Sequence, residues 1–331
     1  MRGRRTRRAL EVGRVARRGR LLRMLAEVGK VGDRPATRDG AKAFREGLEE
    51  LGTTFIKLGQ MLSSRPDLLP DVYIEELEQL VDDVSPFPFE EARRIIDQEV
   101  GLEIFARLDE QPLACASIAQ IHCGLLRTGR EVVVKVRRPR IEEEVALDLE
   151  LLRSLTSFAE GRSQTARLLQ LSALADELDA HLTAELNFVE EAHGSELIAR
   201  IVADHEHLVV PAVIHPYVTD SVLVQERIVG ERVTDQTGLD PEHAAVLARE
   251  LFGAYVQQIT VHGVYHADPH RGNILLTEDG RLALLDFGLL GRLDDDTRRA
   301  LGLLLLALAQ NRADDVADLI LGLSLTTLTS D

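Results

Sequence analysis

The chain has few cysteines and no long hydrophobic run, and each absence narrows what it can do. Its two cysteines, Cys115 and Cys123, form neither a CxxC pair nor a set large enough for a disulfide framework, so we expect a reducing compartment and no zinc site. The longest apolar stretch, residues 301–309, is much shorter than the roughly 18 residues of a membrane-spanning helix. No apolar segment typical of a secretory signal follows the Arg-rich start. These absences predict a cytoplasmic protein without a transmembrane segment.

The negative charge is unevenly distributed along the chain. The 331 residues carry a formal net charge of −16 and are 45% apolar, which is enough for one large core or two lobes. Residues 1–30, however, hold eleven Lys and Arg against only Glu11 and Glu27, a net charge of +9. This basic N-terminal tail is typical either of a segment that contacts the phosphates of lipid or RNA, or of a solvated terminus.

The spacing of apolar residues predicts a helical extension over residues 31–106. Between residues 36 and 64, apolar side chains recur every three or four positions, which predicts one long helix that ends before Arg65-Pro66. Shorter helices are expected at residues 71–83 and 89–100, because prolines between them interrupt the helical pattern.

Two lobes are expected to follow this extension. For residues 107–228, the pattern predicts a β-hairpin of 118–126 and 131–136, helices at 141–159 and 165–201, and a strand pair of 208–214 and 222–228. For residues 229–331, it predicts a helix that runs to Ile259, strands at 274–276 and 282–285 joined by an Asp279-Gly280 turn, and helices thereafter.

The most specific motif is the loop of residues 266–273, His-Ala-Asp-Pro-His-Arg-Gly-Asn, followed by Asp286-Phe287-Gly288. A kinase catalytic loop places an Asp that orients the substrate hydroxyl five residues before an Asn that binds magnesium, and the DFG Asp supplies a second metal contact. Asp268, Asn273 and Asp286 match these positions in order. Taken singly, Asp268 is also explained as a capping or turn residue and the DFG as a β-turn. The combined spacing predicts a site for Mg²⁺ and a nucleotide, because Mg²⁺ prefers oxygen ligands.

A single lysine, Lys135, interrupts an otherwise apolar strand. A cation among valines is costly unless it is paired, and the corresponding kinase lysine contacts the nucleotide phosphates and pairs with a glutamate. The alternative is a lysine that faces solvent from an edge strand. Glu191 is our choice of partner for Lys135. Glu185 lies six residues earlier, about 240° around a helix, so we expect it to serve a different partner.

The chain also lacks the glycine-rich loop and the Ala-Pro-Glu motif of ordinary protein kinases. Residues 114–120, which precede the expected hairpin, are rich in alanine instead. Small residues still let backbone N–H groups approach a phosphate, although Cβ atoms restrict the loop more than glycine does. The missing docking motif disfavours a peptide substrate and leaves a small or lipid-like acceptor, or hydrolysis. The nucleotide-binding candidates are Ala114, Cys115, Ala116, Ser117, Lys135, Glu191 and Glu226.

Together these residues resemble the UbiB family, the AarF-domain atypical kinases associated with isoprenoid quinone biosynthesis. The resemblance covers about residues 31–310 and includes the KxGQ motif, here Lys57-Leu58-Gly59-Gln60, and the ExD region at Glu185. It implies an α+β, protein-kinase-like two-lobed fold with a helical N-terminal extension packed over the active site, where Lys57 pairs with Glu185. The resemblance adds Lys57, Gln60 and Glu185 to Asp268 as catalytic candidates. The metal-binding candidates remain Asn273 and Asp286.

The resemblance further implies an ATP-dependent phosphotransferase or ATPase that binds ATP or ADP with Mg²⁺ and supports ubiquinone-like biosynthesis or lipid homeostasis. The implied partners are the nucleotide, an anionic lipid or isoprenoid quinone precursor, and quinone-pathway proteins, with no specific nucleic acid. The implied location is peripheral at the inner membrane. The alternative function is a pseudokinase scaffold for quinone-pathway proteins. A small-molecule antibiotic kinase shares the catalytic loop but lacks the KxGQ motif and the alanine-rich loop.

Three features depart from the family pattern. Asn187 replaces the Asp of the ExD region, which removes a negative charge near the expected magnesium site. Cys115 replaces an alanine in the alanine-rich loop and adds an oxidisable thiol. Family members commonly continue beyond the length of this chain, so we expect residues 229–331 to form a kinase-like C-lobe, either of a short member of the family or of a fragment that lacks its last helices.

Overall fold

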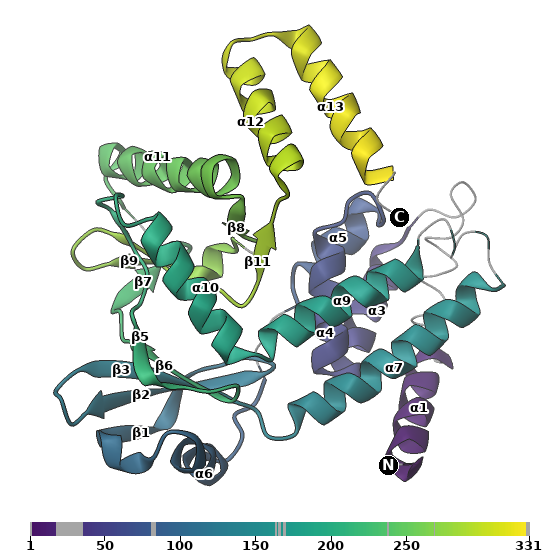
Figure 1. Cartoon of the computed structure of the whole chain (residues 1–331). Coiled ribbons are helices and arrows are strands. Elements are labelled where there is room, and N and C mark those ends of the chain that lie inside the picture. The colour runs from purple at the N-terminus through teal and green to yellow at the C-terminus, as the bar shows by residue number, and fades with distance from the viewer. Residues whose placement is uncertain are drawn as a thin grey trace. The chain divides into compact units, whose positions relative to one another are not determined.

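The computed structural model describes residues 2–17, 36–80, 84–162, 164, 167, 170–236, 238–267 and 269–328. The chain divides into two compact units: unit 1 contains Met1–Gly124 and Val134–Leu186, and unit 2 contains Leu125–Val133 and Asn187–Asp331. Each unit has a hydrophobic cluster of its own. The elements of both units are labelled in Figure 1.

Unit 1 is largely helical, as expected for the segment before the first strand. Its helices are α1 (Arg2–Arg17), α3 (Arg38–Leu51), α4 (Thr53–Ser63), α5 (Asp71–Leu77), α6 (Phe89–Glu99), α7 (Ile141–Glu160) and α9 (Leu171–Glu185). The single helix expected over residues 36–64 is wrong, because Gly52 separates α3 from α4. Gly52 has φ +89° and ψ −161°, a conformation that a residue with a Cβ rarely adopts. The helices expected at 71–83 and 89–100 correspond to α5 and α6, and residues 81–83 lie outside the described part.

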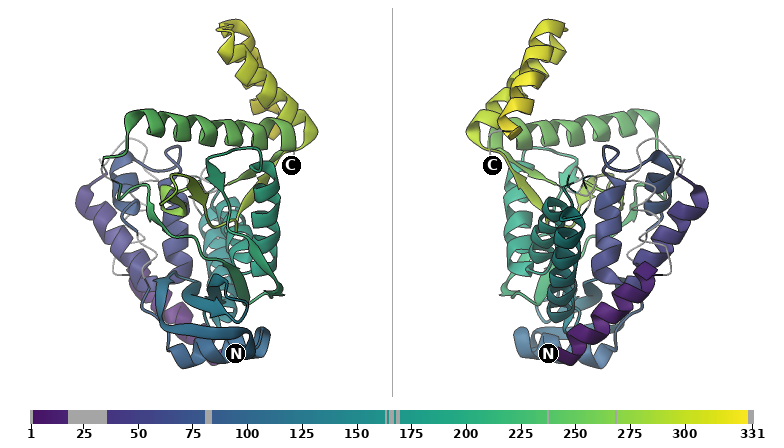
Figure 2. Two further views of the ribbon diagram at one scale, coloured as in Figure 1. Left: turned by 90° about the vertical axis from the view of Figure 1, so that its left-hand side faces the viewer. Right: turned by 90° about the vertical axis from the view of Figure 1, so that its right-hand side faces the viewer.

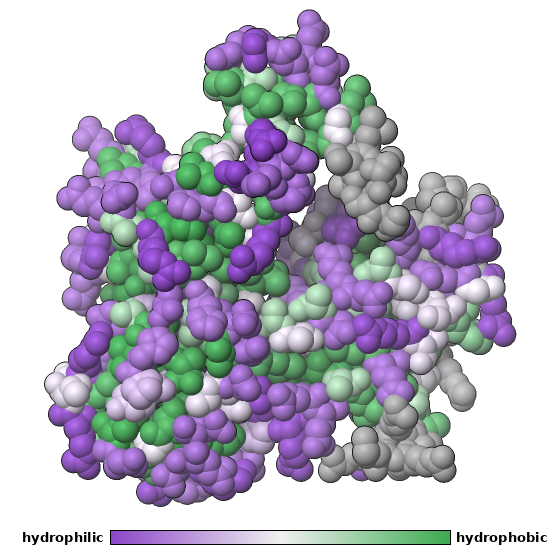
Figure 3. All heavy atoms as spheres, viewed as in Figure 1, coloured by the Kyte–Doolittle hydropathy of each residue, from purple (hydrophilic) through white to green (hydrophobic). Residues whose placement is uncertain are grey.

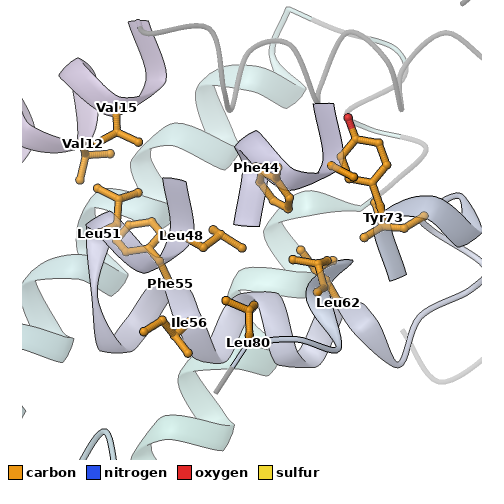
Figure 4. Packing of buried hydrophobic residues seen from close by; sticks show 13 residues of the cluster. Val12, Val15, Phe44, Leu48, Leu51, Phe55, Ile56, Leu62, Tyr73 and Leu80 are labelled. Atoms are coloured by element: carbon orange, nitrogen blue, oxygen red, sulfur yellow. The ribbon is translucent and has the colours of Figure 1, made fainter. Parts of the chain in front are cut away.

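Apolar side chains from α3, α4 and α5 form the hydrophobic cluster of unit 1, which Figure 4 shows from close by. Phe44, Leu48 and Tyr73 are almost fully buried. The rings of Phe44 and Tyr73 lie 6.1 Å apart and are tilted by 60°, within the range of favourable aromatic pairs. The regularly spaced apolar residues predicted from the sequence therefore form a buried helix face, although this face is divided between α3 and α4.

Helix α1 packs on this cluster through one of its faces. Val12 and Val15 are 4% and 1% exposed and belong to the cluster, and Figure 4 shows both beside Leu51 and Phe55. On the same face, Arg8 donates from Nε and Nη2 to the two carboxylate oxygens of Asp148 in α7, at 2.6 and 2.8 Å. Residues 8–15 thus differ from the solvated terminus that composition allowed, because one of their faces is packed on the protein. Residues 18–30 of the basic segment lie outside the described part.

A five-stranded sheet has the order β1-β2-β3-β6-β5. Its strands are β1 (Phe105–Cys115), β2 (Ala119–Leu126), β3 (Glu131–Arg137), β5 (Val213–Val218) and β6 (Val222–Glu226). The expected hairpin is confirmed as β2 and β3, whose turn is closed by a 2.9 Å hydrogen bond from Leu126 N–H to the Arg130 carbonyl. Strand β1 was not predicted from the sequence, because its many polar residues hide the alternation typical of a strand.

The strand pair expected from residues 208–214 and 222–228 is only partly right. Strand β5 begins at Val213 and pairs antiparallel with β6. Residues 208–209 form a separate strand, β4 (Leu208–Val209), which pairs parallel with β10 (Leu282–Leu284). Pro211 lies between β4 and β5, and a proline has no N–H with which to continue a ladder.

The helix expected over residues 165–201 is wrong, because two helices occupy its place. Helix α9 ends at Glu185, and α10 (Phe188–Ile201) begins three residues later. Asn187 between them has an extended backbone, and its side-chain oxygen accepts from the N–H groups of Val189 and Glu190 at 3.1 and 3.2 Å. This is a helix N-cap, so the residue that departs from the ExD pattern starts a new helix. Glu185 and Glu191 lie on different helices, so the argument from their angle around one helix is wrong.

Unit 2 combines helices with short strands. Its further elements are β7 (Gly230–Arg232), α11 (Pro241–Gln257), the π-helical turn η2 (Gln258–His262), β8 (Val264–His266), η3 (Arg271–Asn273), β9 (Ile274–Thr277), β11 (Leu290–Arg292), α12 (Asp295–Ala309) and α13 (Ala313–Leu328). The expected hairpin is confirmed as β9 and β10, which pair antiparallel in a sheet of order β4-β10-β9-β7. The C-terminal region is less uniformly helical than expected, since β11 pairs with β8.

Helices α12 and α13, drawn in yellow, form a helical hairpin in the views of Figures 1 and 2. Figure 3 shows hydrophobic side chains at the surface of this hairpin, and the exposed apolar residues are Leu303, Leu306, Leu308, Ile320 and Leu321. Within the described part of the chain, none of the helices combines the length and the apolar character that a bilayer crossing requires.

The cluster of unit 1 predicts a large effect of shortening a central side chain. Leu48 is 0% exposed, so Leu48→Ala should lower the free energy of unfolding by about 2–5 kcal/mol through lost burial and a residual cavity. Urea unfolding followed by circular dichroism measures this loss. The matched control is Leu113→Ala at a surface position of β1, with an expected change of about 0.5 kcal/mol or less. Equal small effects for both substitutions would contradict the packing described.

Candidate functional site

In unit 1, Lys57 and Glu185 form an ion pair between α4 and the end of α9. Lys57 Nζ lies 3.0 Å from Glu185 Oε1, and His181 Nε2 lies 3.2 Å from the same oxygen. The side chains of Lys57 and Glu185 are 18% and 14% exposed, so the pair is largely shielded from water. The contact that the resemblance implied for these two residues is therefore present, and its catalytic role stays a prediction.

The environment of Glu185 favours its ionised form. Burial alone would raise the pKa of the carboxyl, but the hydrogen bond with His181 and the positive charge of Lys57 outweigh burial and lower the pKa below its ordinary 4.5. Glu185 is thus a carboxylate with two partners on one oxygen, which is the condition under which a shielded charge is tolerated.

Gln60 and Gly59 connect α4 to the segment that follows α5. Gln60 Nε2 lies 3.4 Å from the Leu80 carbonyl oxygen. A Cβ on Gly59 would lie 2.3 Å from Leu80 Cδ1 and 2.7 Å from Leu48 Cδ1, so glycine permits the close packing expected at this position. Gln60, which lies on the same helix as Lys57, thus contacts a backbone carbonyl in the segment after α5.

The alanine-rich loop is shorter than expected. Ala114 and Cys115 close β1, and β2 begins at Ala119, so the connection consists of Ala116, Ser117 and Ile118. The N–H of Ala116 donates to the Ala119 carbonyl at 2.8 Å, which makes the connection a tight turn. This N–H is already used within the protein, so a phosphate near the turn would compete with an internal hydrogen bond.

Two residues that sequence reasoning missed hold this turn from outside. The Ser117 carbonyl accepts from Arg138 Nε at 3.2 Å and from Thr53 Oγ1 at 3.4 Å. Arg138 also donates from Nη2 to the Ser85 carbonyl at 3.1 Å, and its guanidinium lies over the Phe87 ring. Ser117 Oγ is buried and has no hydrogen-bond partner among the described residues. No local motif pointed to Thr53 or Arg138, because both contacts join segments far apart in the sequence.

Lys135 lies on the half-buried face of β3. Its neighbours Val134 and Val136 are fully buried on the other face, as the alternation of the strand predicted. In unit 2, Glu191 is 3% exposed in the first turns of α10, and Glu226 is the last residue of β6. Lys135 and Glu191 belong to different units, and their pairing stays a prediction.

The two metal-binding candidates lie at the open end of the β9–β10 hairpin, Asn273 before β9 and Asp286 after β10. The strand register pairs Ile274 with Leu284, and the Leu285 N–H donates to the Asn273 carbonyl at 2.8 Å. Asn273 is therefore opposite the residue that immediately precedes Asp286. Asp286 has φ +59°, and its Oδ1 accepts from the Gly288 N–H at 3.3 Å.

This pair of oxygen donors fits Mg²⁺ better than a metal that needs a complete protein cage. Among the described residues, no group of three or more His, Cys, Asp or Glu side chains is arranged to hold a metal ion. Mg²⁺ does not require such a group, since it usually keeps several waters and binds substrate phosphates together with one or two protein oxygens. The amide of Asn273 and the carboxylate of Asp286 match that requirement. Asp268, the proposed substrate-orienting residue, lies outside the described residues.

The segments around these candidates are braced by His266 and Phe287. His266 ends β8, and its backbone N–H donates to Gln258 Oε1 at 3.0 Å. The His266 ring lies 5.2 Å from the ring of Phe287, which is 2% exposed. His270 Nδ1 accepts from the Gly272 N–H at 3.1 Å, so this histidine orders its own loop. Gln258, in the π-helical turn, was missed because its contact with His266 depends on tertiary structure.

The mixed helices and sheets, in which residues 266–273 lead into β9 and Asp286-Phe287-Gly288 follows its partner strand β10, fit a protein-kinase-like fold. Residues 79–320 match the model of the ABC1 atypical kinase-like domain, and the chain belongs to this family.

Individual relatives agree with this assignment. The chain is 38% identical over 277 residues to an uncharacterized protein of Synechocystis sp., covering 81% of this chain and 40% of that protein. It is 37% identical over 274 residues to "ACTIVITY OF BC1 COMPLEX KINASE 8, chloroplastic" of Arabidopsis thaliana, covering 79% of this chain and 35% of that protein. The chain thus spans less than half the length of either relative.

A solved structure also shares the fold. The structure of Rv3197 from Mycobacterium tuberculosis, in complex with erythromycin, superposes with a TM-score of 0.56 and 26% sequence identity. The similarity covers 85% of this chain and 72% of that chain.

The lowered pKa of Glu185 predicts a specific loss of stability in acid. A carboxyl whose pKa is lower in the folded state contributes stability that is fully present above its unfolded pKa, near 4.5, and is lost as the pH falls through the lower folded value. The difference in unfolding free energy between wild type and Glu185→Gln should therefore shrink as the pH falls from 7 to 3. Urea unfolding at each pH measures it.

The control for this experiment is Glu90→Gln, which changes an exposed glutamate of α6. Its difference from wild type should stay nearly constant over the same pH range. A constant difference for Glu185→Gln as well would contradict the proposed ionic environment of Glu185.

Proposed function

We propose that this chain binds ATP or ADP with Mg²⁺ and acts as an atypical phosphotransferase or ATPase. The observation that carries the proposal is the β9–β10 hairpin, which sets Asn273 beside the residue preceding Asp286, in a chain that belongs to the ABC1 atypical kinase-like family. Two oxygen donors at one end of a hairpin, within kinase motifs, favour binding of a metal–phosphate complex over a purely structural role.

Each candidate residue has a defined task in this proposal. Lys135, with Glu191 as its partner, binds the nucleotide phosphates, and the turn of residues 116–118 and Glu226 contribute to the nucleotide site. Asn273 and Asp286 would hold Mg²⁺, which neutralises developing charge on the phosphate oxygens. Asp268 orients the attacking hydroxyl or water. The contribution of the protein is mainly positioning and electrostatic stabilisation.

The acceptor is proposed to be a small or lipid-like molecule. Where a protein kinase continues from DFG towards a peptide-docking motif, this chain forms the short strand β11 and then α12, which begins at Asp295. The ion pair of Lys57 and Glu185, together with Gln60, is proposed to take part in catalysis from the helical extension. A role in quinone biosynthesis or lipid homeostasis, with quinone-pathway proteins as partners, is the biological context that we propose.

Two substitutions separate binding from turnover. Asp268→Asn should reduce phosphate release by about 10²–10⁴-fold while leaving nucleotide binding intact, because it removes only the group that orients the attacking oxygen. Asp286→Asn should abolish the Mg²⁺-dependent rise in melting temperature that ATP and ADP cause, because it removes a ligand carboxylate. Phosphate release and thermal-shift titrations with Mg-ATP and Mg-ADP measure these effects.

The same assays decide between an enzyme and a scaffold. Wild type that binds Mg-nucleotide but never releases phosphate, with or without lipid, would contradict the enzyme and favour the pseudokinase scaffold. Wild type that shows no Mg²⁺-dependent response to either nucleotide would contradict both functions.

The exposed face of α1 is proposed to contact an anionic lipid surface. Arg8, Val12 and Val15 face the protein, whereas Arg7, Leu10 and Arg14 lie on the exposed side, and Leu10 is 64% exposed. An apolar side chain between two arginines suits the boundary between lipid headgroups and acyl chains better than the surface of a nucleic acid. We propose a peripheral location at the inner membrane on this basis.

Neutralising this face should weaken lipid binding. Each Arg near an anionic membrane contributes about 1 kcal/mol, so Arg7→Ala/Arg14→Ala should reduce binding to vesicles containing phosphatidylserine by about 30-fold. Vesicle co-sedimentation measures the effect, with pure phosphatidylcholine vesicles as the uncharged comparison. The variant Arg127→Ala/Arg130→Ala, which removes two exposed arginines from the β2–β3 turn, is the charge-matched control. Equal losses in both variants would rule out a specific role of α1.

A further inference from the structure

Helix α10 comes close to the Asp286-Phe287-Gly288 segment at Gly194. A Cβ at this position would lie 2.8 Å from the carbonyl oxygen of Phe287 and 3.2 Å from Leu290 Cδ1. Real Cβ atoms essentially never come as close as the first of these distances. The obstacle is a backbone atom rather than the flexible end of a side chain, so any larger residue must displace the helix or the peptide.

The Phe287 peptide has little freedom to move away. Its side chain is 2% exposed and belongs to the hydrophobic cluster of unit 2. The ring packs against His266, whose backbone N–H is held by Gln258. Phe287 is therefore held on its side-chain face by this packing and approached on its carbonyl face by α10. Close-packed surroundings of this kind transmit a displacement instead of absorbing it.

The carbonyl that faces Gly194 belongs to the same peptide group as the Gly288 N–H. That N–H donates to Asp286 Oδ1 at 3.3 Å. Because a peptide group is planar and rigid, pushing on the Phe287 oxygen also moves the Gly288 N–H. The position of the Asp286 carboxylate is thereby coupled to the distance between α10 and this peptide.

Gly194 also lies one helical turn after Glu191. Residues three apart on a helix share a face, so α10 presents the buried Glu191 and the contact at Gly194 on neighbouring parts of its surface. A shift of α10 that changes one of these positions changes the other, because a short helix moves as a unit.

We propose that Gly194 is a positioning residue that sets the Asp286 carboxylate for Mg²⁺ through the Phe287–Gly288 peptide. This inference rests on the proposed function of Asp286 and adds to it a specific structural determinant. Gly194 itself touches neither metal nor nucleotide. The ligand affected is a divalent cation bound together with a nucleotide. A side chain at position 194 weakens binding of the cation more than binding of the nucleotide.

The ordinary effect of Gly→Ala in a helix differs from the effect that the proposal predicts, so the substitution distinguishes between them. Within a helix, Gly→Ala ordinarily stabilises a protein, because alanine has the higher helix propensity. Gly253 in α11, within the same unit, provides the matched control, since the nearest atom to a Cβ there is His205 Cε1 at an ordinary 3.8 Å. If position 194 had no special contact, Gly194→Ala and Gly253→Ala would behave alike.

The experiment titrates Mg²⁺ into each variant of the 331-residue chain at a fixed concentration of ADP and follows the melting temperature. Gly194→Ala should raise the Mg²⁺ concentration for half-maximal response by about 10–100-fold, the usual cost of disturbing a group that orients a metal ligand. ADP binding in the presence of EDTA should stay within about twofold of wild type. Gly253→Ala should leave both quantities unchanged.

A second variant locates the contact. Leu290→Ala removes the side chain that is the other close neighbour of a Cβ at position 194, but it leaves the Phe287 carbonyl in place. Gly194→Ala/Leu290→Ala should therefore retain the weakened Mg²⁺ response. Full recovery in the double variant would overturn the proposal, because the obstacle would then be Leu290 and not the peptide that holds Asp286.

The outcomes distinguish this inference from the proposed function. A Mg²⁺ response of Gly194→Ala equal to that of Gly253→Ala overturns the inference alone, whereas wild type without any Mg²⁺-dependent response to nucleotide overturns the proposed function and the inference with it. If Gly194→Ala does not fold, hydrogen exchange of the Gly288 N–H in wild type replaces it. That exchange should slow when Mg-ADP is added, and an unchanged rate would overturn the inference.

Discussion

The hydrogen bonds of the β9–β10 hairpin are the constraint on which the candidate metal site depends. A hairpin has one register, and the bond between Leu285 N–H and the Asn273 carbonyl fixes the backbones of the two candidate ligands relative to each other. Asp286, which follows the strand, has a left-handed backbone conformation, and its carboxylate accepts a hydrogen bond from the Gly288 N–H. The strand geometry brings the two backbones together, and the local turn positions the acidic group.

In unit 1, the main electrostatic feature is the shielded carboxylate of Glu185. Glu185 is shielded from water, where an isolated carboxylate would be costly. Lys57 and His181 both lie within 3.2 Å of its Oε1, so the charge is compensated by groups from two helices. The same pair therefore ties α4 to α9 and makes the packing of the helical extension sensitive to the protonation of one side chain.

The sequence allowed the local motifs to be predicted, whereas the breaks between elements and the tertiary contacts were harder. The β2–β3 and β9–β10 hairpins were correct, because short apolar strands around turn residues leave a clear local pattern. The helix breaks were missed: Gly52 adopts a conformation that periodicity does not report, and Asn187 looked like a lost acidic residue although it caps α10. Strand β1 was hidden by its polar residues.

In the candidate site, too, local motifs were predictable and tertiary contacts were not. The identities of Lys57 and Glu185 as partners came from a family motif, because no rule of spacing joins residues on separate helices. Arg138, Thr53 and Gln258 escaped notice because each acts on a backbone atom, and backbone contacts leave no signature in side-chain chemistry. The close approach at Gly194 could not be predicted either, because it depends on the absence of a Cβ facing a distant chain segment.

The match to the family model begins at residue 79, but much of the hydrophobic cluster of unit 1 comes from residues before that position. A shortened protein that began there would lack α3 and α4, and Glu185 would lose its lysine. It would also lack Arg8, which binds Asp148 of α7. The limits of the family model and the limits of a piece that retains its own packing are therefore different in this chain, and the second of these determines where the chain can be divided.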